Sequence, residues 1–444
     1  MLPTIATGNV ASALAGEYEV ANSLRFNKGS SDYLNRTFGT STSTKKCTYS
    51  CWVKRSKLND SGGQYLFTFN NTGSAIYFNG SGTGAGTNDE LVINSDSNFA
   101  FYTDDLYRDV SAWYHIVVAV DTTQGTASNR VKIYVNNVQV TNFGTETYPS
   151  QNADFNNLFS SSGVHEIGRG AATGGTEYFG GYMAEVVFID GQQLDPTSFG
   201  EFDSDTNIWK PIDVSGLTFG TNGFYLDFEN SSSLGADVSG NGNNFTVNNL
   251  TSIDQTTDTC TNNFATMNPL NNENTLSEGN LKIVTGSNTG TAGTIGVSSG
   301  KWYFEVKVDT AGGSFPFIGV VLQERYPVSS VGGGTARWVG NGGLSNGDIV
   351  GFTIDLDSNT FRAYINGSIL AVDSSYVAGS TGELPAGDWI PAISGVSSTF
   401  SVNFGNPPYT ISSGNSDANG YGNFEYSVPS GYYALNTKNL AEYG

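Results

Sequence analysis

The sequence predicts an all-β fold in which two antiparallel sandwiches follow one another, with an arm before them and an extended tail behind. The first observation is composition, because 56 of the 444 residues are Gly and 13% are aromatic. Charged residues make up only 14%, against ~25% in an average soluble domain. The second observation is that apolar and polar residues alternate over short runs, as in half-buried strands. The third is a pair of two-residue turns, each led by Asn, that separate such runs.

The net charge argues against two kinds of partner. The chain carries 20 Lys and Arg against 41 Asp and Glu, which gives a formal charge of −21. Nucleic acids and anionic membrane surfaces both attract cationic faces, so we expect no nucleic-acid partner. No run approaches the ~18 consecutive apolar residues of a membrane-spanning helix. We therefore expect no membrane insertion, and we read no export signal in the first 20 residues.

The three cysteines do not form a disulfide framework. Cys47 and Cys51 would lie on one strand, about 13 Å apart at ~3.3 Å per residue, whereas a disulfide needs Cα atoms within ~7 Å. Cys260 is far away in sequence. We expect inert thiols and folding in a reducing cytoplasm.

The first sandwich is expected at residues 22–210, after an arm at residues 1–21. From Cys47 to Val53 the residues alternate, which places odd-numbered side chains on one face and even-numbered ones on the other. Asn136-Asn137 joins two runs as a hairpin, because Asn tolerates the positive φ of such a turn. The other expected strands lie at residues 23–26, 33–34, 64–69, 75–78, 113–120, 165–168 and 181–191.

A connecting segment with one or two strands is expected at residues 211–260, followed by a second sandwich at residues 261–408. Asn366-Gly367 between two apolar runs is the strongest hairpin signal in the chain. The tail at residues 409–444 is expected to be extended and packed on a neighbour. The expected strands of the second sandwich lie at residues 300–308, 317–321, 347–357, 360–367, 389–393 and 400–405.

The two halves share one pattern. In each, an apolar run ends in Asp (Asp121 or Asp355), and the next run ends in a turn led by Asn (Asn136 or Asn366). This pattern predicts two related sandwiches and not a solenoid of short repeats.

These segments carry resemblances to known families. SLRFNKGSSDYL, TYSCWVKRS, WYHIVVAVD, VKIYVNNVQV and GGYMAEVVFIDGQQLD resemble, in this order, concanavalin A-like, laminin-G-like lectin domains over about residues 22–210. GDIVGFTIDLD, YINGSIL and VNFG resemble SPRY domains over about residues 275–406. The two resemblances imply jelly-roll sandwiches of the concanavalin A-like type. Their pairing, with GTNGFYLDFEN, SGNGNNFTVNNL and TNNFATMNPL, resembles virion proteins of tailed bacteriophages.

The candidate ligand-binding residues are Tyr326, Arg337, Trp338 and Asn341. SPRY domains, by resemblance, bind partners with loops at one end of the sandwich. An aromatic ring can stack on a sugar or anchor a peptide, while Arg and Asn supply fixed donors. The alternative is that Trp338 only covers the edge of the core.

No catalytic residue is assigned. A glycoside hydrolase needs two carboxylates about 5–9 Å apart, and no run supplies such a pair. Glu166 and Glu185 stand on predicted strands without a partner in sequence, so we expect both at the surface. His115 and His165 are expected to be structural, because no Ser-His-Asp arrangement can be assembled.

No metal-binding residue or cofactor is assigned, although calcium is left open. Two runs, Asp203-x-Asp205-x-Asn207 and Asp355-x-Asp357-x-Asn359, alternate oxygen ligands. Both lack the Gly and Glu that complete an EF-hand loop. The alternative is that these side chains form local turns.

The sequence therefore predicts a non-enzymatic structural protein of a phage virion, either a capsid fibre or decoration or a tail-fibre component. It would be assembled in the cytoplasm of the bacterial host, attach to other virion proteins through the arm, and present its sandwiches to host-surface glycans. A homotrimer is expected by analogy with phage fibres. The alternatives are a secreted or surface carbohydrate-binding module or adhesin, and a glycan depolymerase.

Overall fold

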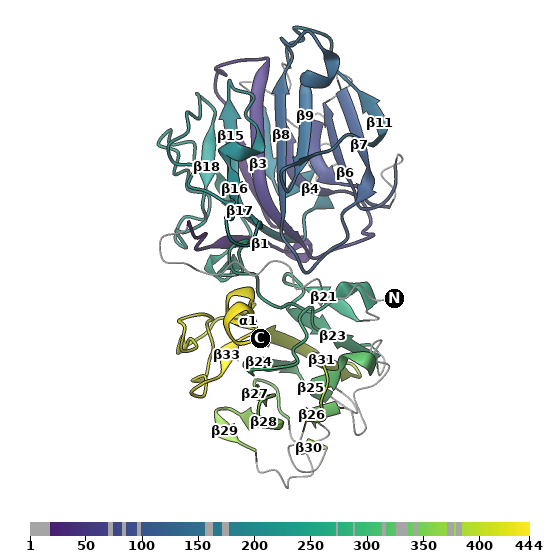
Figure 1. Ribbon diagram of the computed structural model, residues 1–444, viewed down its shortest axis with the longest axis vertical. Coiled ribbons are helices and arrows are strands. Elements are labelled where there is room, and N and C mark those ends of the chain that lie inside the picture. The colour runs from purple at the N-terminus through teal and green to yellow at the C-terminus, as the bar shows by residue number, and fades with distance from the viewer. Residues whose placement is uncertain are drawn as a thin grey trace. The chain divides into compact units, whose positions relative to one another are not determined.

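The computed structural model describes residues 18–69, 74–81, 86–95, 99–155, 163–170, 177–271, 274–286, 289–312, 317–325, 336–340, 344–370, 377–378 and 384–444. The chain divides into two compact units, and each is described by itself (Figure 1). The described residues of the N-terminal unit run from Tyr18 to Thr261, and those of the C-terminal unit from Asn262 to Gly444. The fold is nearly all β, with several antiparallel sheets, as predicted.

Two eight-stranded sheets form the N-terminal unit. The first sheet has the order β10 (Val138–Gln139), β9 (Val131–Val135), β8 (Tyr114–Asp121), β3 (Lys46–Arg55), β15 (Gly181–Asp190), β1 (Ser23–Phe26) and β20 (Gln255–Thr256), with β18 (Phe224–Leu226) also on β15. The second has the order β11 (Phe143–Thr147), β7 (Phe99–Leu106), β6 (Glu90–Ser95), β5 (Ser74–Phe78), β4 (Gln64–Phe69), β12 (Val164–Ile167), β2 (Tyr33–Thr37) and β19 (Thr246–Asn248). In addition, β13 (Arg169–Gly170) pairs with β14 (Glu177–Tyr178), and β16 (Gly200–Phe202) pairs with β17 (Trp209–Pro211), both antiparallel.

The core of this unit is built from the inward faces of both sheets. On β3 the odd-numbered side chains of the predicted alternation, from Cys47 to Val53, all enter one apolar cluster. The ring of Tyr49 on β3 stacks on that of Phe67 on β4, with centroids 5.1 Å apart. Cys47, Cys51 and Cys260 are free thiols.

Several stretches differ from the expected pattern, and two of them shape the N-terminal unit. Strands β6 and β7 occupy residues 90–95 and 99–106, where the sequence predicts no strand. Residues 211–260 contribute three strands, β18, β19 and β20, which pair with β15, β2 and β1 of the N-terminal unit. The outer face of β15 is also buried, because residues such as Phe199, Val214 and Phe219 pack on it.

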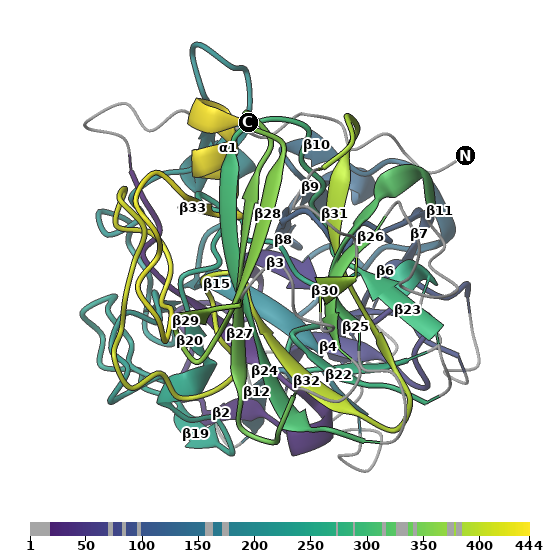
Figure 2. The same ribbon diagram turned by 90° about the horizontal axis from the view of Figure 1, so that it is seen from below.

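Two further sheets form the C-terminal unit. The larger has the order β21 (Thr275–Ser277), β22 (Lys282–Val284), β32 (Thr399–Asn403), β24 (Lys301–Thr310), β27 (Ile349–Asp355), β28 (Thr360–Ile365) and β29 (Ser368–Ile369), with β33 (Tyr433–Ala434) parallel to β24. The smaller has the order β23 (Thr289–Ala292), β31 (Trp389–Gly395), β25 (Phe317–Leu322), β26 (Ala336–Gly340) and β30 (Val377–Ala378). Figure 2 shows β24, β27 and β28 running side by side, in agreement with their pairing.

The core of the C-terminal unit joins both of its sheets. Trp302 on β24 and Trp389 on β31 are fully buried in one cluster, and the rings of Phe304 and Phe352 stack at 4.9 Å. The tail after residue 408 is mostly without regular structure until β33 and helix α1 (Thr437–Tyr443). Asn436 caps this helix by accepting a hydrogen bond from the backbone of Asn439, which satisfies one of its free N–H groups.

Both predicted hairpins are present. Asn136 and Asn137 have φ of 49° and 66°, and Asn366 and Gly367 have φ of 50° and 78°. Two successive positive φ angles match the right-handed twist of the flanking strands. Within the described residues, no helix has both the length and the apolar content needed to cross a bilayer.

Candidate functional site: the loop rim of the N-terminal unit

Two of the four predicted binding residues fall in the described part of the chain. Arg337 and Trp338 lie on strand β26, between β25 and β30, and not in a loop. The side chain of Arg337 is buried and donates to the carbonyl of Ala336 at 2.9 Å. Trp338 is half-buried, with its ring 4.1 Å from that of Phe317. Tyr326 and Asn341 lie outside the described residues.

His115 is a buried structural residue. Its Nδ1 accepts a hydrogen bond from the indole of Trp209 at 3.0 Å, so the proton of the neutral ring lies on Nε2, which is 2.8 Å from the hydroxyl of Ser50. Burial lowers the pKa of His115 to about 3. The ring is therefore neutral and already engaged on both nitrogens.

Glu166 and Glu185 are buried, so the expectation that both lie at the surface is wrong. Glu185 sits at a β-bulge of β15 with a φ of 50°. One of its oxygens accepts hydrogen bonds from the hydroxyls of Tyr18 at 2.9 Å and Tyr225 at 2.8 Å. Glu166 pairs with Arg169 at 3.0 Å. Except for Arg169, these partners are far away in sequence, which is why the pattern along a single strand does not reveal them.

The two Asp-rich runs form turns. One oxygen of Asp203 accepts hydrogen bonds from the backbone of Asp205 and Thr206. Asp355 accepts one from the backbone of Ser358 and pairs with Lys301 at 3.0 Å. In the part of the chain that the structure describes, no group of three or more acidic, His or Cys side chains converges as metal ligands would. Calcium binding stays a prediction.

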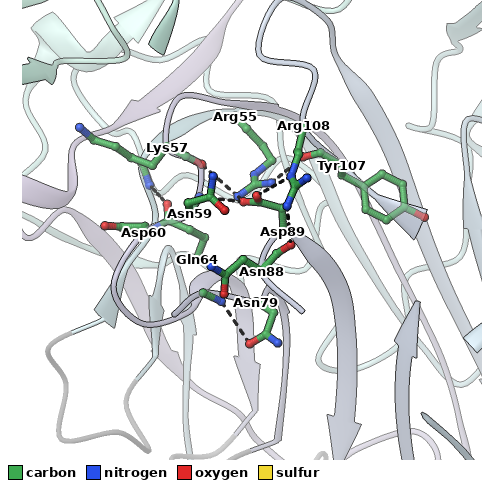
Figure 3. Close-up of polar contacts among 12 residues, drawn as sticks. Arg55, Lys57, Asn59, Asp60, Gln64, Asn79, Asn88, Asp89, Tyr107 and Arg108 are labelled. Atoms are coloured by element: carbon green, nitrogen blue, oxygen red, sulfur yellow. Dashed lines mark hydrogen bonds and ion pairs between the residues drawn. The ribbon is translucent and has the colours of Figure 1, made fainter. Parts of the chain in front are cut away.

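A polar network occupies one loop rim of the N-terminal unit, and its centre is Asp89 (Figure 3). Asp89 precedes β6, is fully buried and has a φ of 71°. Arg55, at the end of β3, donates to one carboxylate oxygen at 3.0 Å, and Arg108, after β7, donates to the other at 2.9 Å. The backbone N–H of Asn59 adds a third bond at 3.0 Å. One carboxylate therefore joins the loops that follow β3, precede β6 and follow β7.

Arg55 extends this network along the loops. Its guanidinium also donates to the carbonyls of Tyr107 and of Lys57, the latter at 2.9 Å, and lies 4.3 Å from the ring centroid of Phe78. Burial lowers the pKa of Arg55, and the charge of Asp89 opposes that shift. A buried ion pair with several further hydrogen bonds gives one geometry to the chain around it.

Four polar side chains stand on this rigid base: Asn59 and Arg108 are exposed, Asp60 is half-buried and Gln64 is buried. We call the set formed by Asn59, Asp60, Gln64 and Arg108 the rim cluster. Asp60 accepts bonds from Lys28 and Gln64, both at 2.6 Å. The side chain of Arg108 keeps 43% of its surface exposed while it pairs with Asp89. Asn59 is exposed and has a φ of 48°, so its amide projects from a turn that the buried network holds in place.

Sequence reasoning did not find the rim cluster. Arg55 and Asp89 are separated by 34 residues, and neither belongs to a short motif. The local signal is weak: polar residues gather at Asn88-Asp89-Glu90, directly after a Gly-rich stretch.

Comparison with known proteins places the rim cluster in a recognised type of domain. Residues 28–194 match the family model Laminin_G_3, described as the concanavalin A-like lectin/glucanases superfamily. Residues 28–194 are therefore similar to concanavalin A-like domains, as predicted, and the rim cluster lies within this range. A comparison with curated proteins finds no match.

The chain is similar to a number of solved structures, among them the following three. A putative carbohydrate-binding protein from Bacteroides ovatus is 18% identical over 52% of this chain and 59% of that one, with a TM-score of 0.39. The SPRY domain of human HERC1 is 16% identical over 31% of this chain and 96% of that one, with a TM-score of 0.24. A heptameric SAP-like pentraxin from Limulus polyphemus is 14% identical over 40% of this chain and 79% of that one, with a TM-score of 0.27. The chain spans less than two thirds of the first of these proteins.

Proposed function

We propose that the protein is a non-enzymatic carbohydrate-binding protein, and that it is a structural component of a phage virion that contacts glycans on the host surface. The glycan contact is assigned to the rim cluster of the concanavalin A-like domain. The virion context is drawn from the sequence segments that resemble virion proteins of tailed phages.

The observation that carries the glycan contact is the buried carboxylate of Asp89, which locks three loops beneath exposed polar side chains. Sugar hydroxyls need donors and acceptors at defined positions, and a rigid base reduces the ordering cost of binding. The amide of Asn59 and the guanidinium of Arg108 supply such groups. Both are exposed, while the charges beneath them are already paired.

The proposal that the protein is not an enzyme rests on the surroundings of Glu166 and Glu185. Glycoside hydrolysis needs an acid and a second carboxylate facing the sugar. Glu185 is buried against two tyrosine hydroxyls, and Glu166 is buried against Arg169. Neither carboxylate can reach a substrate, which supports a binding role.

The glycan proposal is tested on an array of bacterial polysaccharides with the intact protein and two matched variants. Asn59→Gly removes the exposed amide but keeps the positive φ, because Gly adopts it freely. Asn152→Gly is the control, since Asn152 is also exposed and has a φ of 60°. We expect Asn59→Gly to weaken binding at least tenfold and the control to bind as the wild type. If both variants bind equally well, the rim cluster is not the glycan-binding site. If the wild type binds no polysaccharide, the proposed glycan contact is wrong.

The virion context is tested by antibody-gold labelling of intact particles from the source. Labelled particles would support it, and the label's position would separate a capsid decoration from a tail fibre. Antigen found only in culture medium or on cells would favour an adhesin or carbohydrate-binding module. Release of reducing ends from host polysaccharide would favour a depolymerase. Light scattering of the purified chain tests the proposed homotrimer. Deletion of residues 1–17, which belong to the arm predicted at residues 1–21, tests attachment through the arm.

A further inference from the structure

The C-terminal unit has a small pocket on the outer face of its larger sheet. The pocket has a volume of about 220 Å³, and three tyrosines line it: Tyr303 on β24, Tyr364 on β28 and Tyr426 from the tail. Tyr303 is buried, while Tyr364 and Tyr426 are half-buried. Strands β24, β27 and β28 are neighbours (Figure 2), so residues far apart in sequence meet here.

Two glycines give the pocket its depth. A Cβ atom at Gly351 would lie 2.6 Å from the hydroxyl of Tyr303, and one at Gly367 would lie 2.8 Å from the ring of Tyr426. Gly367 also has a φ of 78°, which other residues adopt at a cost. Side chains at these positions would push the tyrosines from their places, so the open space depends on both glycines.

The buried carboxylate of Glu305 holds the tail wall of the pocket in place. Its two oxygens accept hydrogen bonds from the backbone N–H of Glu425 at 3.0 Å and of Tyr426 at 2.9 Å. Tyr303 and Asn403 donate to the same carboxylate at 3.0 and 3.2 Å. Four bonds to one fully buried group define the geometry of the wall. The pocket is therefore pre-formed, as small-ligand sites usually are.

The chemistry of the lining selects the class of ligand. Tyrosine rings carry a negative face that attracts C–H groups with partial positive charge, and one face of a pyranose ring presents such groups. The phenolic oxygen of Tyr303 donates to Glu305 and keeps accepting capacity. The exposed residue Ser427 also lines the pocket, and its hydroxyl, which donates to Asn415, can still accept. None of the described residues that line the pocket carries a charged side chain. The volume is below the ~300–1,000 Å³ of sites for drug-sized ligands, which suits one neutral ring.

We propose that this tyrosine pocket, made by Tyr303, Tyr364 and Tyr426, binds a single neutral pyranose unit as a second saccharide site, separate from the rim cluster. The inference shares only the ligand class with the proposed function, because it stands on different residues in the other unit.

The test uses the intact chain and a panel of methyl pyranosides of glucose, galactose, mannose and N-acetylglucosamine. Saturation-transfer NMR and calorimetric titration measure binding to the wild type and to Tyr364→Ala, Tyr426→Ala and Tyr426→Phe. We expect at least one glycoside to bind. Each Ala variant should lose tenfold or more in affinity, and Tyr426→Phe should lose less than threefold because the stacking face remains. Tyr443→Ala is the control, since Tyr443 stacks on Tyr433 and does not line the pocket.

Each outcome either supports or overturns the proposal that the tyrosine pocket binds a pyranose unit. Loss in both Ala variants with unchanged binding in Tyr443→Ala supports the pocket, provided that thermal unfolding shows all variants folded. If an Ala variant unfolds, Gly351→Ala serves instead, since it displaces Tyr303 while leaving the tail bonds in place. No glycoside binding, or equal binding in all variants, overturns the inference. If the polysaccharide array remains positive in that case, the proposed function stands without the pocket.

Discussion

Asn136 and Asn366 perform the same task in the two units. Each begins a two-residue turn. The side chain of Asn136 accepts a hydrogen bond from the backbone N–H of His115 at 2.8 Å, and that of Asn366 accepts one from the backbone N–H of Ile349 at 3.0 Å. The backbone N–H of each Asn returns a bond to the carbonyl of that same residue. The strand order β3-β8-β9-β10 thus corresponds to β24-β27-β28-β29.

The correspondence extends to an ion pair at the other end of these strands. Lys46 at the start of β3 lies 3.2 Å from Asp121 at the end of β8. Lys301 at the start of β24 lies 3.0 Å from Asp355 at the end of β27. The pattern seen in the sequence therefore reflects one four-strand arrangement used twice.

Each turn Asn should stabilise its own unit. Asn136→Ala and Asn366→Ala lose a side-chain acceptor and place Ala at a positive φ, at a combined cost of about 1–3 kcal/mol. Hydrogen exchange during denaturant unfolding should locate each loss in the unit that carries the change. Asn137→Gly is the control, because Gly tolerates its φ of 66° and should leave stability unchanged. An Asn136→Ala protein as stable as the wild type would contradict this reading.

Asp89 should be essential for the stability of the N-terminal unit. Asp89→Asn keeps the shape but leaves Arg55 buried without its counter-charge, and breaking a buried pair costs about 3–5 kcal/mol. Arg108→Ala should cost only about 1 kcal/mol, because that side chain is partly exposed and screened. Urea unfolding of both variants measures the loss of unfolding free energy in each and shows which loss is larger. A larger loss for Arg108→Ala than for Asp89→Asn would show that the outer arginine, and not the buried pair, holds the loops.

Glu185 should make the N-terminal unit less stable as the pH rises. Burial raises its pKa to about 7; the hydroxyls of Tyr225 and Tyr18 oppose the shift, and Asp227 and Glu229 add to it. The native state therefore holds a proton that the unfolded chain releases near pH ~4.3. Stability falls as the pH rises from about 4 to about 7, by an amount on the order of 3 kcal/mol.

Glu185→Gln isolates this effect, because it removes the titration while keeping a group that accepts hydrogen bonds. The difference in unfolding free energy between the variant and the wild type should grow between pH 5 and pH 8, in favour of the variant. Other carboxylates titrate in both proteins, so their contributions cancel in the difference between the two unfolding free energies. A difference that does not change with pH would mean that Glu185 titrates normally.

Glu305 should hold the tail on the C-terminal unit. Glu305→Ala removes the acceptor for the N–H groups of Glu425 and Tyr426, so their amide exchange should accelerate about tenfold or more. Mass spectrometry of peptides that cover residues 415–434 measures this. Glu442→Ala, at an exposed position near the end of α1, should not change it. Unchanged exchange in Glu305→Ala would show that other contacts hold the tail.

Local signals predicted most of the strands but not the surroundings of the polar groups. The alternation from Cys47 to Val53 and the turns at Asn136 and Asn366 depend on neighbours in sequence, and the structure confirms them. Trp338 is expected in a loop by resemblance to SPRY domains, yet it lies on a strand that pairs with β25 and β30. Strand pairing over such a distance leaves little trace in a single segment.

The all-β class, the two related halves and their hairpins follow from the sequence alone, because side-chain alternation and turn chemistry act over a few residues. The packing of the folded chain reveals that Asp89 pairs with Arg55 and Arg108. It also brings Glu185 to Tyr18 and Tyr225, and it gathers three tyrosines around a pocket. Each of these sites needs strands from distant parts of the chain to become neighbours. Its burial and charge depend on that packing, and no local pattern records it.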